Sequence, residues 1–126
     1  MAKYVDGFVF VVPNDKTDDY KQMAKEGAEA WMKNGALAYF ECKGDDLFPP
    51  PMGEEEPLRF PVMAKAKSDE TVWFSFIIFK SKEHRDEVNA KVYAEMEKDA
   101  AKYEGVPMPF DESRMVFGGF EVVVEG

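Results

Sequence analysis

The chain has 126 residues, which suits one compact domain over residues 1–126 and is too short for two. Its 25 acidic and 16 basic residues leave a net charge of −9, so the attraction to phosphate that drives nucleic-acid binding is missing and no DNA or RNA partner is expected. The single histidine and single cysteine are too few for the ligand sets of most metal centres, so we expect no metal and no cofactor.

The N-terminal segment predicts a strand. Residues 3–12 are rich in β-branched and aromatic side chains on both faces and end at Pro13, with Asp6 conspicuous among them. No basic patch and long apolar stretch precede this strand. The longest uncharged run of the chain, residues 71–79, has nine residues, far fewer than the ~20 of a membrane-spanning helix. We therefore expect a cytoplasmic protein with no membrane partner.

A helix and a second strand are predicted next. Asn14 or Asp15 can cap a helix that stops at Gly35, and apolar or small residues recur along it at helical spacing. Residues 36–43 then form a strand on which Glu41 shares a largely apolar face. Cys42 lies on the other face of that strand, where we interpret it as a small core residue.

Residues 44–57 predict a surface loop. The segment holds four of the eight prolines, five acidic residues and no Lys or Arg, so it alone carries five of the nine excess negative charges. Its three consecutive prolines favour an extended polyproline conformation. We interpret the acidic residues as solvated, because three adjacent carboxylates point in different directions and do not form a metal cage.

The second half of the chain predicts two strands joined as a hairpin, then a helix that Ser81 can cap, then a closing strand. These elements span residues 59–67, 71–80, 81–103 and 114–125. The strand at 71–80 is apolar on both faces, which is typical of a central strand. Two adjacent glycines in the last strand, Gly118 and Gly119, favour a bulge or a close backbone contact.

The element order is β-α-β-β-β-α-β, or β-α-β-β-α-β if residues 59–80 contribute one long bent element. It indicates an α+β, ferredoxin-like fold with an antiparallel sheet. Two helices cover only one face of such a sheet, yet at least three strands are apolar on both faces. A second copy of the chain is the economical cover, so we expect a homodimer packed sheet to sheet, a dimeric α+β barrel.

Short motifs spread over nearly the whole chain carry a likeness to a known family. They are YVDGF at 4–8, GAL at 35–37, EC at 41–42, FSF at 74–76, SKE at 81–83, RD at 85–86, MPFD at 108–111, RM at 114–115 and GGFE at 118–121. Together they resemble the YbaA-like family of bacterial proteins of unknown function. The resemblance implies membership of the dimeric α+β barrel superfamily, which includes cofactor-free monooxygenases, lactone isomerases, haem enzymes and ligand-binding domains, and so selects no single activity.

One charged residue of the second long helix is out of place. At 100° per residue, Arg85 falls on the apolar stripe with Asn89 close to it, and a guanidinium there must find a carboxylate. The carboxylates that the pattern offers are Asp6, Glu41, Asp111 and Glu121. Two main interpretations stay open: a buried ion pair that ties helix to sheet, and a site in which Arg85 binds an anionic ligand, with Asn89, Asp111 and Glu121 as further candidate ligand-binding residues. Fraying of the first helical turn into solvent is a third.

Three residues are candidates for proton transfer. Asp6 and Glu41 could enter a cavity where burial raises a carboxyl pKa toward that of a general base, and Tyr39 is a further candidate base. The aromatic side chains of the sheet suit either a flat apolar ligand or dimer packing. They include Tyr39, Trp73, Phe74, Phe76 and Phe117.

These observations support more than one function. The first is a homodimeric barrel that binds a small apolar or aromatic molecule, with a cofactor-free enzyme of the monooxygenase or isomerase type as its catalytic form. The alternative is a non-catalytic dimeric binding or interaction protein. Haem binding through His84 is a third hypothesis, since one axial imidazole suffices for haem.

Overall fold

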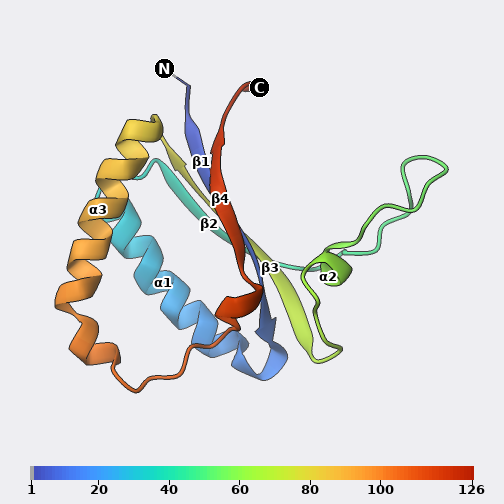
Figure 1. Ribbon diagram of the computed structural model, residues 1–126, viewed down its shortest axis with the longest axis horizontal. Coiled ribbons are helices and arrows are strands. Elements are labelled where there is room, and N and C mark those ends of the chain that lie inside the picture. Colours follow the sequence, from blue (N-terminus) through green and yellow to red (C-terminus); the bar gives the residue numbers. More distant parts are fainter. Residues whose placement is uncertain (1) are drawn as a thin grey trace.

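The computed structural model describes residues 2–126 as four strands, three α-helices and three short 3-10 turns (Figure 1). In chain order the strands and α-helices are β1 (Tyr4–Pro13), α1 (Thr17–Lys33), β2 (Ala38–Lys43), α2 (Phe60–Met63), β3 (Glu70–Phe79), α3 (Lys82–Lys98) and β4 (Val116–Glu121). The 3-10 turns are Asn14–Lys16, Ala100–Tyr103 and Glu112–Arg114. None of the helices within residues 2–126 combines the length and the apolar composition needed to cross a membrane.

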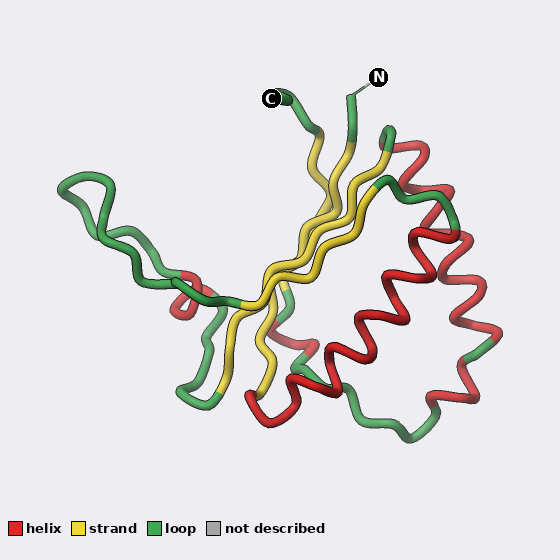
Figure 2. Tube along the Cα trace, turned by 180° about the vertical axis from the view of Figure 1, so that it is seen from behind, coloured by secondary structure: helices red, strands yellow, loops and turns green. Residues whose placement is uncertain are grey.

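The strands form one antiparallel sheet in the order β2-β3-β1-β4. Both long helices, α1 and α3, lie on the same side of this sheet (Figures 1 and 2). The predicted ferredoxin-like α+β architecture is therefore confirmed, with the order β-α-β-β-α-β for its strands and long helices. The central strands β1 and β3 pair along their whole length, from Tyr4 opposite Phe79 to Pro13 opposite Glu70.

One predicted strand is wrong. Residues 59–67 do not pair with β3 but form the single helical turn α2, and β3 pairs with β1 and β2 instead. Pro61 lies in the first turn of α2, where its missing N–H is not needed, whereas in a strand it would remove a ladder hydrogen bond. The turn places Ala64 against Val11 and Val72 on the side of the sheet away from α1 and α3.

Two sequence signals at the helix ends are seen in the structure, and one prediction is wrong. Asn14 and Asp15 do not cap α1 but lie in the 3-10 turn Asn14–Lys16, and the N-cap position of α1 is Lys16, which makes no side-chain capping hydrogen bond. The Ser81 hydroxyl accepts a hydrogen bond from the backbone N–H of His84 at 3.1 Å, which caps α3. After α1 the chain turns at Gly35, whose φ of +112° is a conformation that favours glycine. Gly119 is needed for a different reason: a side chain there would collide with Tyr4, because its Cβ would lie 2.5 Å from the Tyr4 ring.

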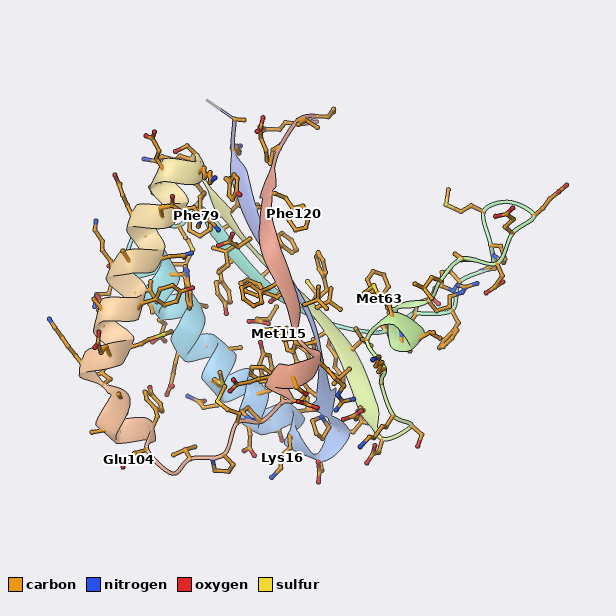
Figure 3. The ribbon with its side chains drawn as sticks, in the orientation of Figure 1. Lys16, Met63, Phe79, Glu104, Met115 and Phe120 are labelled. Carbon is orange, nitrogen blue, oxygen red and sulfur yellow. The ribbon has the colours of Figure 1, made fainter. Side chains whose placement is uncertain are left out.

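The core lies between the sheet and the two long helices. Its fully buried side chains come from β1, β3 and α3, and they are Phe10, Val12, Phe79, Val88 and Val92. Val11 is also fully buried, but on the other face of the sheet against Ala64 and Val72. Phe79 packs between the sheet and α3 (Figure 3). Around Phe10, the rings of Tyr20 and Phe110 pack with centroids 5.1 and 5.4 Å away.

The opposite face of the sheet carries exposed apolar side chains. The residues that alternate away from the helices include Phe40, Phe74, Val116 and Phe120, all exposed in the single chain. Cys42 lies on this face and is also exposed, so its interpretation as a core residue is wrong. The face was assigned correctly, but in the single chain only α2 and its neighbouring residues cover part of it.

Arg85 lies in a network that ties α3 to β1 and α1. Its Nη1 is 2.8 Å from Oδ1 of Asp6, a carboxylate that is 6% exposed, and its guanidinium lies 4.8 Å from the centre of the Tyr4 ring. Asn89 donates to the other Asp6 oxygen at 3.2 Å and accepts from the Trp31 indole N–H at 2.9 Å. Of the three interpretations of Arg85, the structure shows the ion pair between helix and sheet.

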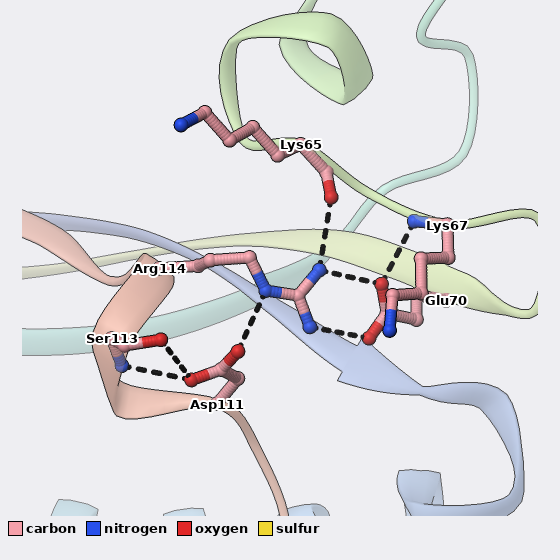
Figure 4. Close-up of polar contacts among 6 residues, drawn as sticks. All are labelled: Lys65, Lys67, Glu70, Asp111, Ser113 and Arg114. Atoms are coloured by element: carbon pink, nitrogen blue, oxygen red, sulfur yellow. Dashed lines mark hydrogen bonds and ion pairs between the residues drawn. The ribbon is translucent and has the colours of Figure 1, made fainter.

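A second network joins the start of β3 to the turn before β4 (Figure 4). Both terminal nitrogens of Arg114 donate to the Glu70 carboxylate at 2.6 Å, and its Nε donates to Asp111 at 2.8 Å. These contacts, together with hydrogen bonds from Ser113 to Asp111, lower the pKa of both carboxyls to about 2. The network therefore joins the first residue of β3 to the 3-10 turn that precedes β4.

We expect Arg85→Ala to lower the free energy of unfolding by about 3 kcal/mol or more, because it leaves Asp6 buried without its cation. Urea denaturation measures this effect. The control is Asp86→Ala: Asp86 also bonds Arg85, at 2.8 Å, but its side chain is 61% exposed, so its loss should cost about 1 kcal/mol or less. Equal stabilities of Arg85→Ala and the natural protein would show that the Asp6 pair contributes nothing.

We expect Arg114→Gln to flatten the acid limb of the stability profile. Glu70 and Asp111 have folded-state pKa values of about 2, below the ordinary 4.5 and 3.8. Their contribution is therefore complete above about pH 5 and is lost as the pH falls toward about 2. Urea denaturation at several pH values measures the profile. The control Lys3→Gln removes an exposed pair with Glu125 and should keep the steep acid limb; an unchanged limb in Arg114→Gln would contradict the expectation.

Candidate functional site

A cavity of about 460 Å³ lies between α1 and the edge strand β2. Its volume falls within the range of small-molecule sites. Residues from α1, β2 and β3 line it: Thr17, Lys21, Ala24, Lys25, Ala28, Tyr39, Glu41, Lys43 and Trp73. Two of the three residues that the sequence proposes for proton transfer, Tyr39 and Glu41, are therefore in one cavity, while Asp6 is outside it.

Strand alternation places the polar residues of β2 in the cavity. Tyr39, Glu41 and Lys43 are two residues apart, so they share the face of β2 that α1 covers. The Tyr39 hydroxyl donates to Oε2 of Glu41 at 2.7 Å, and the Tyr20 hydroxyl, from the start of α1, donates to Oε1 at 2.7 Å. Each carboxylate oxygen of Glu41 is thus held by one tyrosine.

Burial controls the electrostatics of this cluster. Removal from water raises the pKa of the Glu41 carboxyl, against the opposing effect of hydrogen bonds from Tyr39, Tyr20 and Ser75. Burial and the neighbouring Glu41 charge raise the pKa of both tyrosines, so the two phenols stay protonated and act as donors. Glu41 is consequently a carboxylate that accepts a proton more readily than an exposed one does.

Gly27 allows α1 to approach this cluster. A Cβ at that position would lie 3.1 Å from the Tyr39 hydroxyl oxygen, so a larger residue would press against the phenol that holds Glu41. The sequence shows only a glycine within a helical pattern, with no indication of its contact. Tyr20 was likewise assigned only to the apolar stripe of α1, because its bond to Glu41 joins segments 21 residues apart.

The wall of the cavity away from the polar cluster is aromatic and small. Ala24 and Ala28 lie one helical turn apart on α1, and Trp73 faces them from β3. Trp73 is 4% exposed, its ring packs edge-on against Tyr20, and its Nε1 is the one buried side-chain polar atom without a partner within residues 2–126. The cavity therefore offers an apolar surface beside the polar cluster.

The other candidate residues lie outside this cavity. Arg85 and Asn89 are bonded to Asp6, and Asp111 is bonded to Ser113 and Arg114. Glu121 is exposed at the end of β4. The structure thus does not join Arg85, Asn89, Asp111 and Glu121 into one anion-binding site.

The two residues with metal or redox chemistry are also apart from the cavity. His84 accepts a hydrogen bond on Nδ1 from the backbone N–H of Lys80 at 3.0 Å and packs edge-on against Phe79. Cys42 lines a smaller cavity of about 220 Å³ beside Leu47, Phe60 and Phe74. Across residues 2–126 no three His, Cys, Asp or Glu side chains are placed to hold a metal ion.

Comparisons with known proteins place the chain in a family. The family model described as a protein of unknown function, DUF1428, matches residues 3–112. The uncharacterized protein YbaA of Escherichia coli K12 is 43% identical over 123 residues, which cover 98% of each chain, and YbaA of Shigella flexneri matches equally well.

A solved structure supports the fold alone. A dimeric ferredoxin-like protein from an uncultured marine organism superposes over the whole of both chains with a TM-score of 0.65 and 11% sequence identity. The resemblance predicted from the short motifs is confirmed by the relatives, and the ferredoxin-like fold by this structure. By the family model and by its close identity to YbaA, the chain belongs to the DUF1428 family of proteins of unknown function.

Proposed function

We propose that this protein is a homodimer that binds a small, flat, largely apolar molecule in the cavity between α1 and β2, and that Glu41 accepts a proton from that molecule. The observation that carries the proposal is the Glu41 carboxylate, half-buried in a cavity of about 460 Å³ with both oxygens held by tyrosine hydroxyls. The isomerase type of cofactor-free chemistry suits this arrangement.

The proton-transfer step requires only groups of this cavity. A C–H bond next to a ligand carbonyl breaks, its electron pair stays on the ligand as an enolate, and the proton moves to ionised Glu41. Return of the proton to a different atom gives the isomer. Tyr20 and Tyr39 orient the carboxylate, and their raised pKa values assign the base role to Glu41 and not to Tyr39.

The homodimer is proposed from the uncovered face of the sheet. Phe40, Phe74, Val116 and Phe120 are exposed there, and contiguous apolar surface of this kind marks an interface. The acidic loop extends on the same side of the sheet, away from α1 and α3 (Figure 2). The fold neighbour described as dimeric supports a second copy as the occupant of this face.

The alternative is a non-catalytic dimeric binding protein. It shares the cavity and the interface and differs only in the absence of chemical turnover. Aromatic surfaces suit ligand binding and dimerisation whether or not a reaction follows. A direct test of proton transfer therefore distinguishes the enzyme from the non-catalytic binding protein.

We expect the protein to accelerate exchange of the acidic hydrogens of 2-tetralone, a flat neutral ketone, for deuterium in D₂O, by about a hundredfold over buffer. Proton NMR follows the exchange. Glu41→Gln should remove the acceleration. Because Glu41 must be ionised and its pKa lies above the ordinary 4.5, the rate should fall as the pH is lowered, with a midpoint above 4.5. The groups that surround it are Tyr20, Tyr39, Ser75 and the cavity lysines Lys21, Lys25 and Lys43.

The control for this experiment is Glu121→Gln, which removes a carboxylate outside the cavity and should leave the rate unchanged. Acceleration that persists in Glu41→Gln would contradict the base role. A natural protein that exchanges no faster than buffer would leave the non-catalytic alternative in its place.

We expect the protein to sediment at twice the mass of one chain and Phe74→Glu to shift it toward monomer, because a charge would be buried in the interface. The control is Met96→Glu: Met96 lies on α3 and, like Phe74, is 43% exposed. Analytical ultracentrifugation measures the distribution.

Cys42 supplies a second readout of the same interface. It lies on the uncovered face of the sheet, so a thiol reagent should modify it slowly in the dimer and faster on dilution or in Phe74→Glu. Circular dichroism of each variant checks that the chain is folded. A natural protein that sediments as a monomer at every concentration, with Cys42 freely reactive, would contradict the homodimer.

A further inference from the structure

The cavity beside Glu41 has a charge opposite to that of the chain as a whole. The protein carries a net charge of −9, but the charged residues that line this cavity are three lysines, Lys21, Lys25 and Lys43, and one glutamate. Lys21 and Lys25 lie one turn apart on α1, and Lys43 lies at the end of β2. The lysines therefore converge on the cavity from two elements.

These lysines have no carboxylate partner. Within residues 2–126 the ion pairs of lysine are Lys3 with Glu125 and Lys33 with Glu95, and none involves Lys21, Lys25 or Lys43. All three are exposed, whereas Glu41 and Tyr39 are half-buried and Trp73 is buried. The positive charge thus lies at the rim of the cavity and the aromatic and carboxylate groups lie deeper.

The hydrogen-bonding groups follow the same division. At the rim the ammonium groups can only donate. Deeper in the cavity, ionised Glu41 can only accept. A ligand hydroxyl group donates a hydrogen bond to ionised Glu41, which a ligand carboxylate cannot do.

We propose that the ligand of this cavity is a small aromatic acid with a hydroxyl or enol group at one end and a carboxylate at the other. The hydroxyl lies at Glu41, the ring lies against Ala24 and Ala28, and the carboxylate meets the lysines of the rim. This assignment deepens the proposed function and rests on it, because it requires that the cavity bind a small molecule.

Titration calorimetry with four related compounds tests the assignment. The probe is 4-hydroxyphenylacetate; phenylacetate lacks its hydroxyl, 4-ethylphenol lacks its charge, and tyramine replaces the carboxylate by an ammonium group. We expect 4-hydroxyphenylacetate to bind about tenfold more tightly than phenylacetate and about tenfold more tightly than 4-ethylphenol, with tyramine weakest. Added salt should weaken the binding of the two acids and not that of 4-ethylphenol.

Two double variants separate the cavity lysines from the overall charge. Lys21→Gln with Lys25→Gln should weaken binding of 4-hydroxyphenylacetate about tenfold and leave 4-ethylphenol unaffected. Lys33→Gln with Lys91→Gln removes the same charge from outside the cavity and should change neither. All of these lysines are exposed, so the variants are expected to fold.

The outcomes distinguish this inference from the proposed function. If 4-ethylphenol or tyramine binds as tightly as 4-hydroxyphenylacetate, or if none of the four compounds binds, the hydroxy-acid assignment is overturned, and exchange of neutral 2-tetralone still tests the cavity and Glu41. If 4-hydroxyphenylacetate binds equally well to Ala28→Phe, in which the larger side chain fills the cavity, its site lies elsewhere and the hydroxy-acid assignment fails, while the exchange of 2-tetralone still tests the proposed function.

Discussion

The constraint on which this structure depends is that two helices cover one face of a four-stranded sheet and no more. Because side chains alternate along each strand, the two faces of the sheet carry different residues, and only one of these sets is covered by the long helices. Side chains on the covered face pack against α1 and α3 or line the cavity beside Glu41, whereas Phe40, Phe74 and Phe120 on the other face stay exposed in the single chain. The proposed ligand cavity and the proposed dimer interface therefore lie on opposite sides of one sheet.

Burial of charge on the covered face takes two forms. Asp6 is matched by the cation of Arg85 and by Asn89, so it is a fixed tie between helix and sheet. Glu41 receives only neutral hydroxyl donors from Tyr20 and Tyr39, so its charge is solvated but not neutralised. Burial raises the pKa of the Glu41 carboxyl although the hydrogen bonds from the two tyrosines oppose that rise. The ion-paired Asp6 thus has a structural role, and Glu41 is the carboxylate that we propose as the proton acceptor.

The sequence predicts most of the fold because its signals are local. The Ser81 cap, the Gly35 stop and the apolar strands are seen where they were expected, and Arg85 was recognised as a buried cation. Residues 59–67 were misassigned because their composition suits a strand, while Pro61 suits the first turn of a helix better. Cys42 was assigned to the correct face but not to an uncovered one. Only part of the site could be predicted from the sequence. Glu41 and Tyr39 are two residues apart on one strand, whereas Tyr20, Trp73 and the lysines of α1 come close to them only in the folded structure.

The effect of the net charge on ligand binding depends on where the charged residues lie in the fold. Five of the nine excess negative charges belong to the loop at 44–57, which extends away from the helices (Figure 2). A charge affects a binding site mainly within about a Debye length, ~8 Å in physiological salt. The charged residues that line the cavity are Lys21, Lys25, Lys43 and Glu41, so the sign of its local charge is opposite to that of the net charge. A protein with a negative net charge can thus have a cavity lined mainly by positive side chains. Here Lys21 and Lys25 of α1 supply two of them.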